Sequence, residues 1–473
     1  MNNRRSLGVL GMAVAAVIAV SSCSSGGGRG ANPDATNTGN GGGGSTSTTQ
    51  ASKFGTLDTP CGKGNATGAT DRGVTNTSIN IAYGDDRGFS GSPGLNKEMG
   101  DSIKAFIKWC NDQGGINGRQ INGDFYDAKI SLANNVMTQA CTKDFMLVGE
   151  GFAADGAGEA TRVKCNLVAV PGFAVLADFA NGPMMYQGVP NPVDYTPASL
   201  WYQAVKLFPA ESKKFAFVDT SLEATHVSIL KQHQPAQQAG VVSAGCDITL
   251  NYFGESDYKP FVRKLQSCGA KMLFTNLSPG PVLYNFLTAM HQLSYNPIFL
   301  METNLYTQPY AAWNTAGYGN NSYVRSAFIP LEEANVVPAV KQYVDIVKAD
   351  GGSTSQLGEQ AVSSFLLWAT AAKECGSNLT RQCMVNNLAK VKSWTGGGLH
   401  AETDPSSNMP PQCGMIIKLN GTSWQRDYPT KAGTFDCDPK YQAKVPENLW
   451  STKLNSDRIA TTFLTPSAIM PQS

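Results

Sequence analysis

The sequence has almost no net charge, since its 473 residues include 37 Lys and Arg against 36 Asp and Glu, a formal charge of +1. Proteins that bind nucleic acids neutralise phosphates with a basic patch, which requires an excess of lysine and arginine. This balance excludes nucleic acid as an expected partner. Because the chain is long and 41% hydrophobic, we expect two packed globular lobes rather than one core.

Common catalytic motifs are also missing. Gly88-Phe89-Ser90-Gly91-Ser92 lacks the final glycine of a GxSxG hydrolase turn, and residues 149–154 form a GxGxxG pattern without its third glycine. There is no GxxxxGK(S/T) phosphate loop, and the four histidines show no HExxH spacing for zinc. We therefore expect no enzyme, no cofactor and no metal site.

No apolar run is long enough to span a bilayer, and the run from Leu7 to Val20 is instead typical of an export signal. It ends in Val20-Ser21-Ser22-Cys23, which resembles the lipobox of bacterial lipoproteins, where the cysteine becomes the lipid-modified N-terminus. An ordinary cleaved signal with a chance cysteine is the alternative. We expect residues 1–23 to be the signal and lipobox and residues 24–60, rich in Gly, Ser and Thr, to be a disordered tether.

Cysteine usage agrees with export. Ten of the eleven cysteines remain once Cys23 is set aside, and none stands in a CxxC pair that would indicate zinc or a redox motif. Some could remain buried free thiols, but short loops favour disulfides. The pairs suggested are Cys141 with Cys165, Cys246 with Cys268, Cys375 with Cys383 and Cys413 with Cys437, leaving Cys61 for Cys110.

From Ser78 onward, short apolar runs alternate with amphipathic stretches, which predicts βαβ units and a parallel sheet. Ile103, Phe106, Ile107 and Cys110 recur at helical spacing and predict one buried helix face. Strands are expected at 78–83, 123–126, 146–149, 167–170, 215–218, 240–244, 272–275 and 298–301. Helices are expected at 132–143, 156–164, 198–208, 224–239, 258–268, 282–293, 337–348 and 359–375.

The fold class expected is α/β, with two doubly wound lobes joined by a hinge. Asn420-Gly421 between two alternating runs predicts a C-terminal hairpin. The expected parts are lobe 1 at 78–195, lobe 2 at 196–304, a return to lobe 1 with C-terminal helices at 305–410, a hairpin associated with lobe 2 at 411–445, and a tail at 446–473.

Three segments resemble the branched-chain amino-acid-binding proteins, which have the type I periplasmic binding fold. They are the glycine-rich Gly88-Phe89-Ser90-Gly91, the turn Gly114-Gly115-Ile116-Asn117-Gly118-Arg119, and Phe125-Tyr126-Asp127 at a strand end. The resemblance covers about residues 78–429. It implies a solute-binding lipoprotein of an ABC importer, in which two lobes close by a hinge motion on a small molecule.

The resemblance also implies which loops contact the ligand. The loops after corresponding strands line the interlobe cleft, and Glu302 should emerge at the carboxyl end of its strand, although pairing with a Lys or Arg is an alternative role. Each loop could instead merely turn the chain. Carried over by position, the candidates are Phe89, Ser90, Gly151, Phe152, Ala153, Ala154, Gly172, Phe173 and Ala174 on lobe 1, and Thr220, Glu223, Asn276, Ser278 and Glu302 on lobe 2.

Two of these loops depart from the amino-acid-binding pattern. Members of that family grip the ligand's α-carboxylate with hydroxyls and backbone N–H groups, whereas these loops read Phe152-Ala153-Ala154 and Gly172-Phe173-Ala174. Aromatic walls favour flat or apolar bodies. We therefore expect an apolar or aromatic acid or amide in preference to a free amino acid, unless the Phe side chains point into the lobe core and backbone N–H groups alone bind the ligand.

The expected partners are a small-molecule ligand, the ABC permease subunits and, through Cys23, the outer face of the cell membrane; the protein is expected to be a monomer. One alternative is a ligand-sensing extracellular receptor, which should continue into a transmembrane helix and a signalling domain that we do not find after the hairpin. The other is an enzyme on the same fold, which would need a nucleophile and base or a metal.

Overall fold

The computed structural model describes residues 53–472, so the predicted signal, the lipobox around Cys23 and residues 24–52 of the predicted tether lie outside the described residues. The prediction that the tether reaches residue 60 is wrong. β1 (Lys53–Phe54) and β2 (Leu57–Asp58) pair antiparallel. The Phe54 side chain is fully buried, with its ring 5.5 Å from that of Phe106. This aromatic contact fixes a segment whose composition is otherwise polar.

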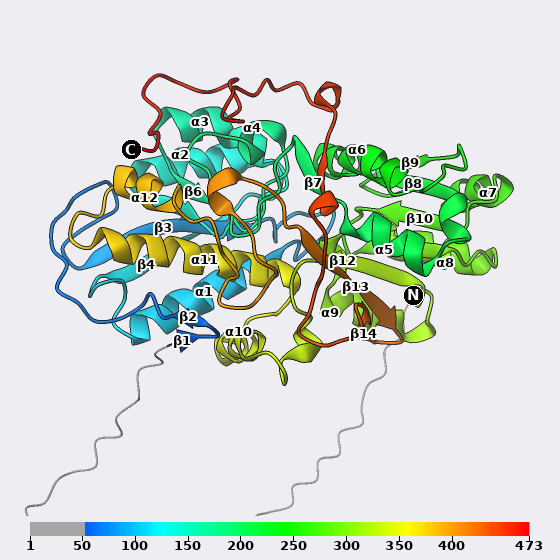
Figure 1. The fold of residues 1–473 in the computed structure, drawn as a ribbon, viewed down its shortest axis with the longest axis horizontal. Helices are drawn as coiled ribbons and strands as arrows, with labels where there is room; N and C mark the ends of the chain where they lie inside the picture. Colours follow the sequence, from blue (N-terminus) through cyan, green and yellow to red (C-terminus); the bar gives the residue numbers. More distant parts are fainter. Residues whose placement is uncertain (1–52, 473) are drawn as a thin grey trace, which may run out of the picture. The chain divides into compact units, whose positions relative to one another are not determined.

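The first lobe is built on a four-stranded parallel sheet. Ile81 and Tyr83 face α1, while Ala82 between them faces α2, as the alternation of side chains along a strand requires. The strand order is β4 (Gln120–Asp127), β3 (Ser78–Asp85), β5 (Met146–Val148) and β6 (Ala169–Val170). Figure 1 shows α2 (Ala133–Lys143) and α3 (Glu159–Lys164) on one face, and α1 (Lys97–Asp112) and α11 (Gln356–Cys375) on the other. The predicted doubly wound lobe is confirmed.

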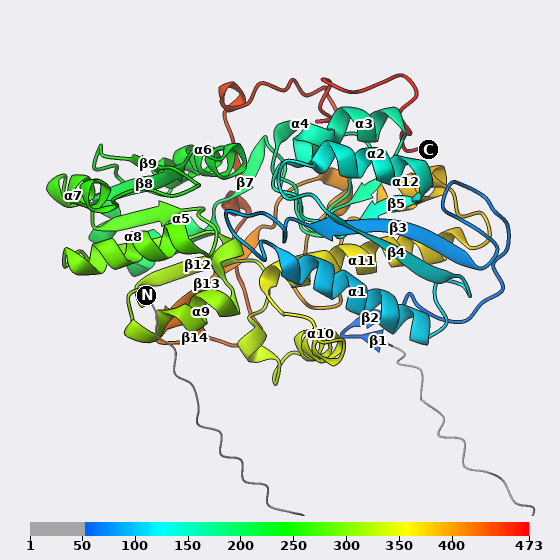
Figure 2. The same ribbon diagram turned by 180° about the vertical axis from the view of Figure 1, so that it is seen from behind.

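The second lobe has a larger mixed sheet. Its order is β14 (Ser423–Tyr428), β13 (Cys413–Asn420), β12 (Ser322–Ser326), β11 (Ile298–Met301), β10 (Met272–Thr275), β8 (Phe215–Thr220) and β9 (Ile248–Leu250), with β15 (Asp436–Cys437) beside β13. The strands from β8 to β12 are parallel, and β13 and β14 are antiparallel. One face packs on α5 (Ser199–Leu207) and α6 (Glu223–Gln238), and the other on α7 (Lys259–Ser267) and α8 (Pro281–Gln292). Figure 2 shows α1 and α8 nearest the viewer.

Two predictions for this lobe are wrong. Residues 240–244 form no strand beyond a single bridge between Ser243 and Phe215, because Gly240 and Gly245 have positive φ and turn the chain at both ends. The return to lobe 1 was expected from residue 305, but β12 lies in the second sheet. The return therefore begins after Ser326.

Several short elements join the lobes. β7 (Tyr195–Pro197), in the crossover, pairs with β16 (Gln442–Lys444), which follows the C-terminal hairpin. The remaining α-helices of the described chain are α4 (Ala177–Ala180), α9 (Gln308–Trp313), α10 (Pro338–Ala349) and α12 (Arg381–Leu388).

The C-terminal tail from residue 446 runs along the first lobe (Figure 1). The Ala460 N–H donates to the Asn181 carbonyl at 2.8 Å, and Arg458 pairs with Asp194 at 2.6 Å. The tail therefore fastens to the segment that leads from lobe 1 into the crossover.

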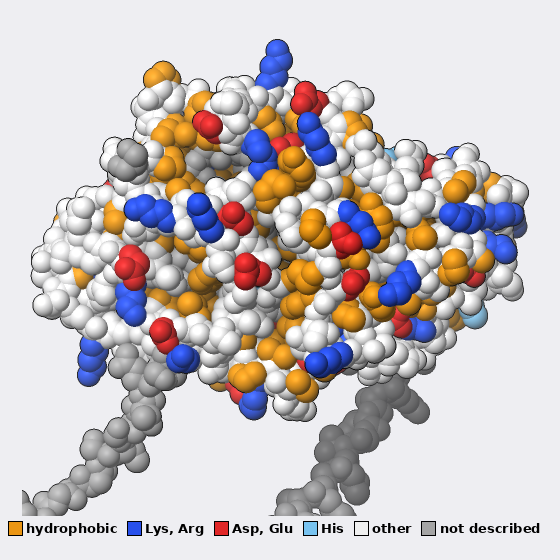
Figure 3. Space-filling model, viewed as in Figure 1, with side chains coloured by type: hydrophobic (Ala, Val, Ile, Leu, Met, Phe, Trp, Pro, Cys, Tyr) orange, Lys and Arg blue, Asp and Glu red, His pale blue; other side chains and the backbone are white. Residues whose placement is uncertain are grey.

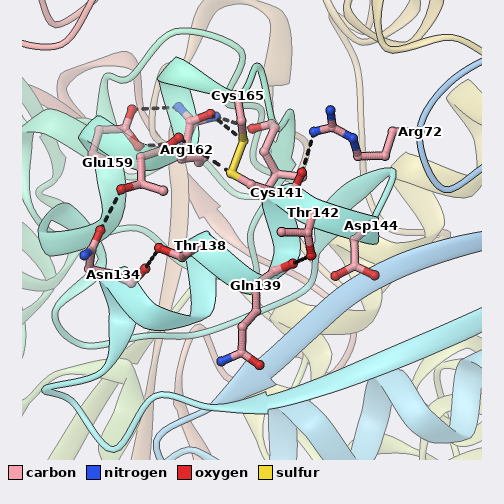
Figure 4. The surroundings of a disulfide bond; sticks show 12 residues. Arg72, Asn134, Thr138, Gln139, Cys141, Thr142, Asp144, Glu159, Arg162 and Cys165 are labelled. Carbon is pink, nitrogen blue, oxygen red and sulfur yellow. Dashed lines mark hydrogen bonds and ion pairs between the residues drawn. A yellow bond between two sulfur atoms is a disulfide. The ribbon is translucent and has the colours of Figure 1, made fainter.

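All five expected disulfides are present, in the expected pairs. Figure 4 shows Cys141–Cys165, which links the end of α2 to the residue after α3. Beside it, Arg162 is buried and makes a bidentate ion pair with Glu159, each bond 2.6 Å long. The bridge ties α3 to α2, and Arg162, oriented by Glu159, also donates to the carbonyls of Leu167 and Pro183 outside the helix.

On the face drawn in Figure 3, Lys and Arg side chains are interspersed with Asp and Glu, and no broad area of one sign covers it. This distribution agrees with the near-zero net charge of the sequence. It offers no basic stripe of the kind that follows a nucleic-acid backbone.

The Cys61–Cys110 bridge closes a loop with a sequence separation of 49, whereas Cys375–Cys383 closes one of 8. In the chain-entropy model, removing these bridges lowers the free energy of unfolding by about 4 and about 2.5 kcal/mol, respectively. Denaturant unfolding of the two double Cys→Ser variants should show the larger loss for the Cys61 and Cys110 pair. A larger loss for the Cys375 and Cys383 pair would contradict the view that the Cys61–Cys110 bridge stabilises the protein through its longer loop.

Glu150, just after β5, is 1% exposed, and neither of its carboxyl oxygens has a hydrogen-bond partner within the described residues. Burial raises the pKa of Glu150 to about 8. Because an unfolded glutamate ionises near pH 4.5, the folded state loses stability as the pH rises from about 4.5 to about 8. Glu150→Gln should make this decline shallower in melting curves taken across that range, and an unchanged slope would contradict the assignment.

Candidate functional site

A cleft lies between the two lobes, with about 1070 Å³ between its atoms when the opening to solvent is included. Its first-lobe wall consists of the loops after β3, β5 and β6, part of the crossover, and the start of α11. Its second-lobe wall consists of residues after β9, β10, β11 and β12, with the start of α6. Both walls therefore use the carboxyl ends of parallel strands, where open α/β sheets present ligand-binding loops.

The structure brings half of the predicted contact residues into this cleft. Those that line it are Ala153, Gly172, Phe173 and Ala174 on the first lobe, and Asn276, Ser278 and Glu302 on the second. Those that do not are Phe89, Ser90, Gly151, Phe152, Ala154, Thr220 and Glu223.

Phe152 differs most clearly from its predicted position. Its side chain is 1% exposed and packs in the first-lobe core with Ala82, Tyr126 and Met137. The prediction that Phe152 forms an aromatic wall of the cleft is therefore wrong, whereas Phe173 lines the cleft. Because the two phenylalanines lie in loops, where side chains do not alternate regularly as they do along a strand, the sequence alone could not decide which of them faces inward.

Other predicted contact residues that do not line the cleft lie elsewhere in the structure. Thr220 is buried and hydrogen-bonded to Thr225, while Ser90 and Glu223 are exposed. Phe89 reaches across to the second lobe, with its ring 6.2 Å from that of Tyr252 and 5.9 Å from that of Phe253. Phe89 thus bridges the lobes without lining the cleft.

Buried aspartates hold the first-lobe loops. Asp86 Oδ2 accepts the Ala153 N–H at 2.7 Å, and its Oδ1 accepts the Ile130 N–H at 2.6 Å. Asp155 accepts the N–H groups of Val175 at 2.7 Å and Leu176 at 3.0 Å.

Burial raises the pKa of both aspartates, to about 6 for Asp86 and about 8 for Asp155, although the N–H donors act in the opposite direction. Asp155 therefore holds a proton more readily than an exposed aspartate, which reduces the charge behind this wall. The N–H groups of Ala153, Val175 and Leu176 are therefore used for structure.

On the second-lobe wall, Glu302 pairs with Arg325 from β12, Nε to Oε2 at 2.6 Å. The predicted alternative role of Glu302 in ion pairing is therefore confirmed, and Glu302 lines the cleft as well. Glu302 is 4% exposed, and its second oxygen, Oε1, has no partner within the described residues. These are the two charged residues that line the cleft, and their charges cancel.

A buried lysine lies close to this pair. Lys231 Nζ donates to Asn191 Oδ1 at 2.8 Å and to the Pro192 carbonyl at 2.6 Å. Burial is the main cause that lowers the pKa of Lys231 to about 7, and the neighbouring Arg325 lowers it further. Asn191 Nδ2 also donates to the carbonyl of Ala174, so the crossover links α6 to the first-lobe wall.

Amide side chains that the sequence did not suggest complete the site. Four of them line the cleft and carry buried atoms without a hydrogen-bond partner in the described part of the chain: Gln187, Asn304, Gln356 and Gln360. Buried polar atoms are rarely left unpaired, because desolvation without a new bond is costly. Asn304 follows Glu302 by two residues, and this proximity was an available signal. The others come from the crossover and from α11, and no local pattern marks them.

Between Lys53 and Gln472, no three His, Cys, Asp or Glu side chains lie together as metal ligands. In the same part of the chain, no helix is both long and apolar enough to cross a bilayer.

Comparison with known proteins identifies relatives of this fold. A sequence model described as periplasmic binding protein matches residues 79–423. No curated protein sequence matches the chain.

Solved structures match over most of their length. A fatty acid ABC transporter substrate-binding protein from Thermomonospora curvata is 16% identical, with 78% of this chain and 100% of that chain covered and a TM-score of 0.63. A branched-chain amino acid transporter substrate-binding protein from Streptococcus pneumoniae, in complex with isoleucine, is 16% identical, with coverages of 74% and 99% and a TM-score of 0.59. A solute-binding protein from R. palustris, in complex with 4-hydroxybenzoate, is 14% identical, with coverages of 75% and 98% and a TM-score of 0.59.

At these identities the likeness shows the fold, which is the type I periplasmic binding fold with two α/β lobes. The family match spans most of the chain and includes every strand from β3 to β13. The chain therefore belongs to the periplasmic binding protein family, whose members work outside the cytoplasm as binding proteins.

Proposed function

We propose that this protein is the solute-binding lipoprotein of an ABC-type importer, anchored through Cys23 to the outer face of the cell membrane. It binds a small organic molecule in the interlobe cleft, as a monomer, and delivers it to the permease subunits. The observation that supports this most directly is the set of buried, unpartnered polar atoms that line the cleft, on Gln187, Glu302, Gln356 and their neighbours. A ligand that supplies hydrogen bonds to them removes their desolvation cost.

The cleft favours a ligand with an apolar or aromatic body, either an acid or an amide. Phe173, Tyr252 and Phe328 line it together with aliphatic side chains such as Leu222 and Leu357. The fatty acid ABC transporter substrate-binding protein and the solute-binding protein in complex with 4-hydroxybenzoate have the same fold.

The cleft is less suited to a free α-amino acid, because of where its hydroxyl groups lie. None of the described first-lobe residues that line the cleft has a hydroxyl group; the hydroxyls at the cleft, such as those of Ser278 and Thr303, belong to the second lobe. The hydroxyl clamp for an α-carboxylate is therefore missing from the wall where the family places it.

Phe173 and Phe152 offer a matched pair of substitutions. Phe173→Ala should weaken binding of an aromatic ligand by about tenfold or more, because it removes a ring worth about 0.5 to 1.5 kcal/mol beyond the area it buries. Phe152→Ala should leave the affinity nearly unchanged but lower stability by about 3 to 5 kcal/mol, because it empties a core position. Calorimetry with leucine, valine, glutamate and a panel of aromatic acids and amides, together with denaturant unfolding, measures both effects. Tight leucine binding that Phe173→Ala leaves untouched would refute the ligand class, and a panel without any ligand would refute the receptor function.

The anchoring proposal rests on Val20-Ser21-Ser22-Cys23, which lies outside the described residues. Cys23→Ala removes the thiol that the lipid modifies, so the protein should be released into the medium or remain unprocessed. Fractionation of cells and mass spectrometry of the mature N-terminus provide the measurement, with Ser24→Ala as the control that keeps the cysteine. A Cys23→Ala protein that is still processed and membrane-bound would exclude this anchor.

A further inference from the structure

Four backbone N–H groups in the first-lobe loops already have protein acceptors. The Ala153 N–H is bonded to Asp86, and the N–H groups of Val175 and Leu176 are bonded to Asp155. The Gly172 N–H donates to the carbonyl of Glu150 at 2.9 Å. A carboxylate placed against these four N–H groups would lose its hydration and meet donors that already serve other acceptors.

The second-lobe wall presents oxygens in a fixed orientation. Arg325 occupies Oε2 of Glu302, which leaves Oε1 unpartnered. Asn304 donates its Nδ2 to the Leu277 carbonyl at 3.2 Å, and because a carbonyl can only accept, the Oδ1 of Asn304 is the atom left unpartnered. Both atoms belong to residues that line the cleft, and both require a donor from the ligand.

Three glutamines complete the polar lining from the opposite side. Both polar atoms of the Gln187 side chain are unpartnered, so it can accept and donate at once. Gln356 and Gln360 lie four residues apart in the first turns of α11 and therefore share one face of the helix. Gln187 and Gln356 are each 1% exposed, which makes their unpaired atoms costly in the empty cleft.

We propose that the ligand is a neutral carboxamide with an apolar body, an inference that rests on the proposed receptor function and narrows it. The amide N–H₂ group donates to Glu302 Oε1 and Asn304 Oδ1, and its carbonyl oxygen accepts from the side-chain amide of Gln187 or Gln356. The corresponding carboxylate has no N–H to give to these two oxygens, and it adds a negative charge beside Glu302, whose own charge is balanced by Arg325. The corresponding amine adds a positive charge to a lining whose own two charges already cancel.

Matched ligands test this directly, because they share one body and differ only in the polar group. Calorimetry of the purified full chain would compare benzamide, benzoate and benzylamine, then hexanamide, hexanoate and hexylamine, with leucine as the amino-acid probe. We expect at least one amide to bind, with a Kd at least tenfold lower than those of its acid and amine.

Substitution of the glutamines separates a ligand contact from a structural role. Gln187→Leu and Gln356→Leu keep the volume but remove the unpaired polar atoms, so each should weaken the amide at least tenfold while the melting temperature of the ligand-free protein stays equal or rises. Gln139→Leu on α2, where the side chain is exposed and outside the cleft, is the control and should change neither quantity.

Several outcomes would overturn the proposal. If benzoate, hexanoate, an amine or leucine binds as tightly as the amides, the carboxamide assignment fails while the receptor function stands. If both glutamine variants lower the ligand-free melting temperature and leave the affinity ratio of amide to acid unchanged, the glutamines are structural and the assignment fails. If neither amide binds, it fails as well, and the wider panel of acids, amides and amino acids then decides whether the receptor function fails with it.

Discussion

Two buried carboxyl groups determine what the first lobe presents to a ligand. Asp86 and Asp155 are each 1% exposed or less, and each accepts backbone N–H groups from a loop at the edge of the cleft. These bonds give the loops a fixed conformation that their short apolar sequences could not maintain alone. The same bonds occupy the N–H groups of Ala153, Val175 and Leu176, so one interaction both builds the wall and withdraws these donors from a ligand.

The sheets could be predicted from the sequence because their signal is local. The apolar runs at Met272–Thr275 and Ile298–Met301 form strands with the predicted bounds, each bordered by residues that end the run. The disulfide pairs followed from short separations in a chain expected to be exported. Residues 240–244 failed as a strand because Gly240 and Gly245 turn the chain at both ends, so the segment bonds to β8 only at Phe215 and the ladder forms at β9 instead.

The site was only partly predictable, for a different physical reason. Strand ends can be located from the sequence, so Glu302 and Asn276 were placed correctly at the cleft. Gln187, Arg325 and Gln356 reach it from a crossover, a later strand and a helix that is distant in sequence, and only the folded topology brings them together. Whether a loop side chain points into the cleft or into the core depends on one peptide's orientation, which explains the opposite fates of Phe152 and Phe173.

The N-terminal end of the described chain is fastened to one lobe only. β1 and β2 pack through Phe54 against Phe106 of α1, and Cys61 is covalently bonded to Cys110 at the end of the same helix. Any pulling force that arrives through the residues before Lys53 therefore enters the first lobe and bypasses the crossover. Relative to an N-terminus held in place, any motion between the lobes would be motion of the second lobe. A force applied at Lys53 therefore does not act across the cleft.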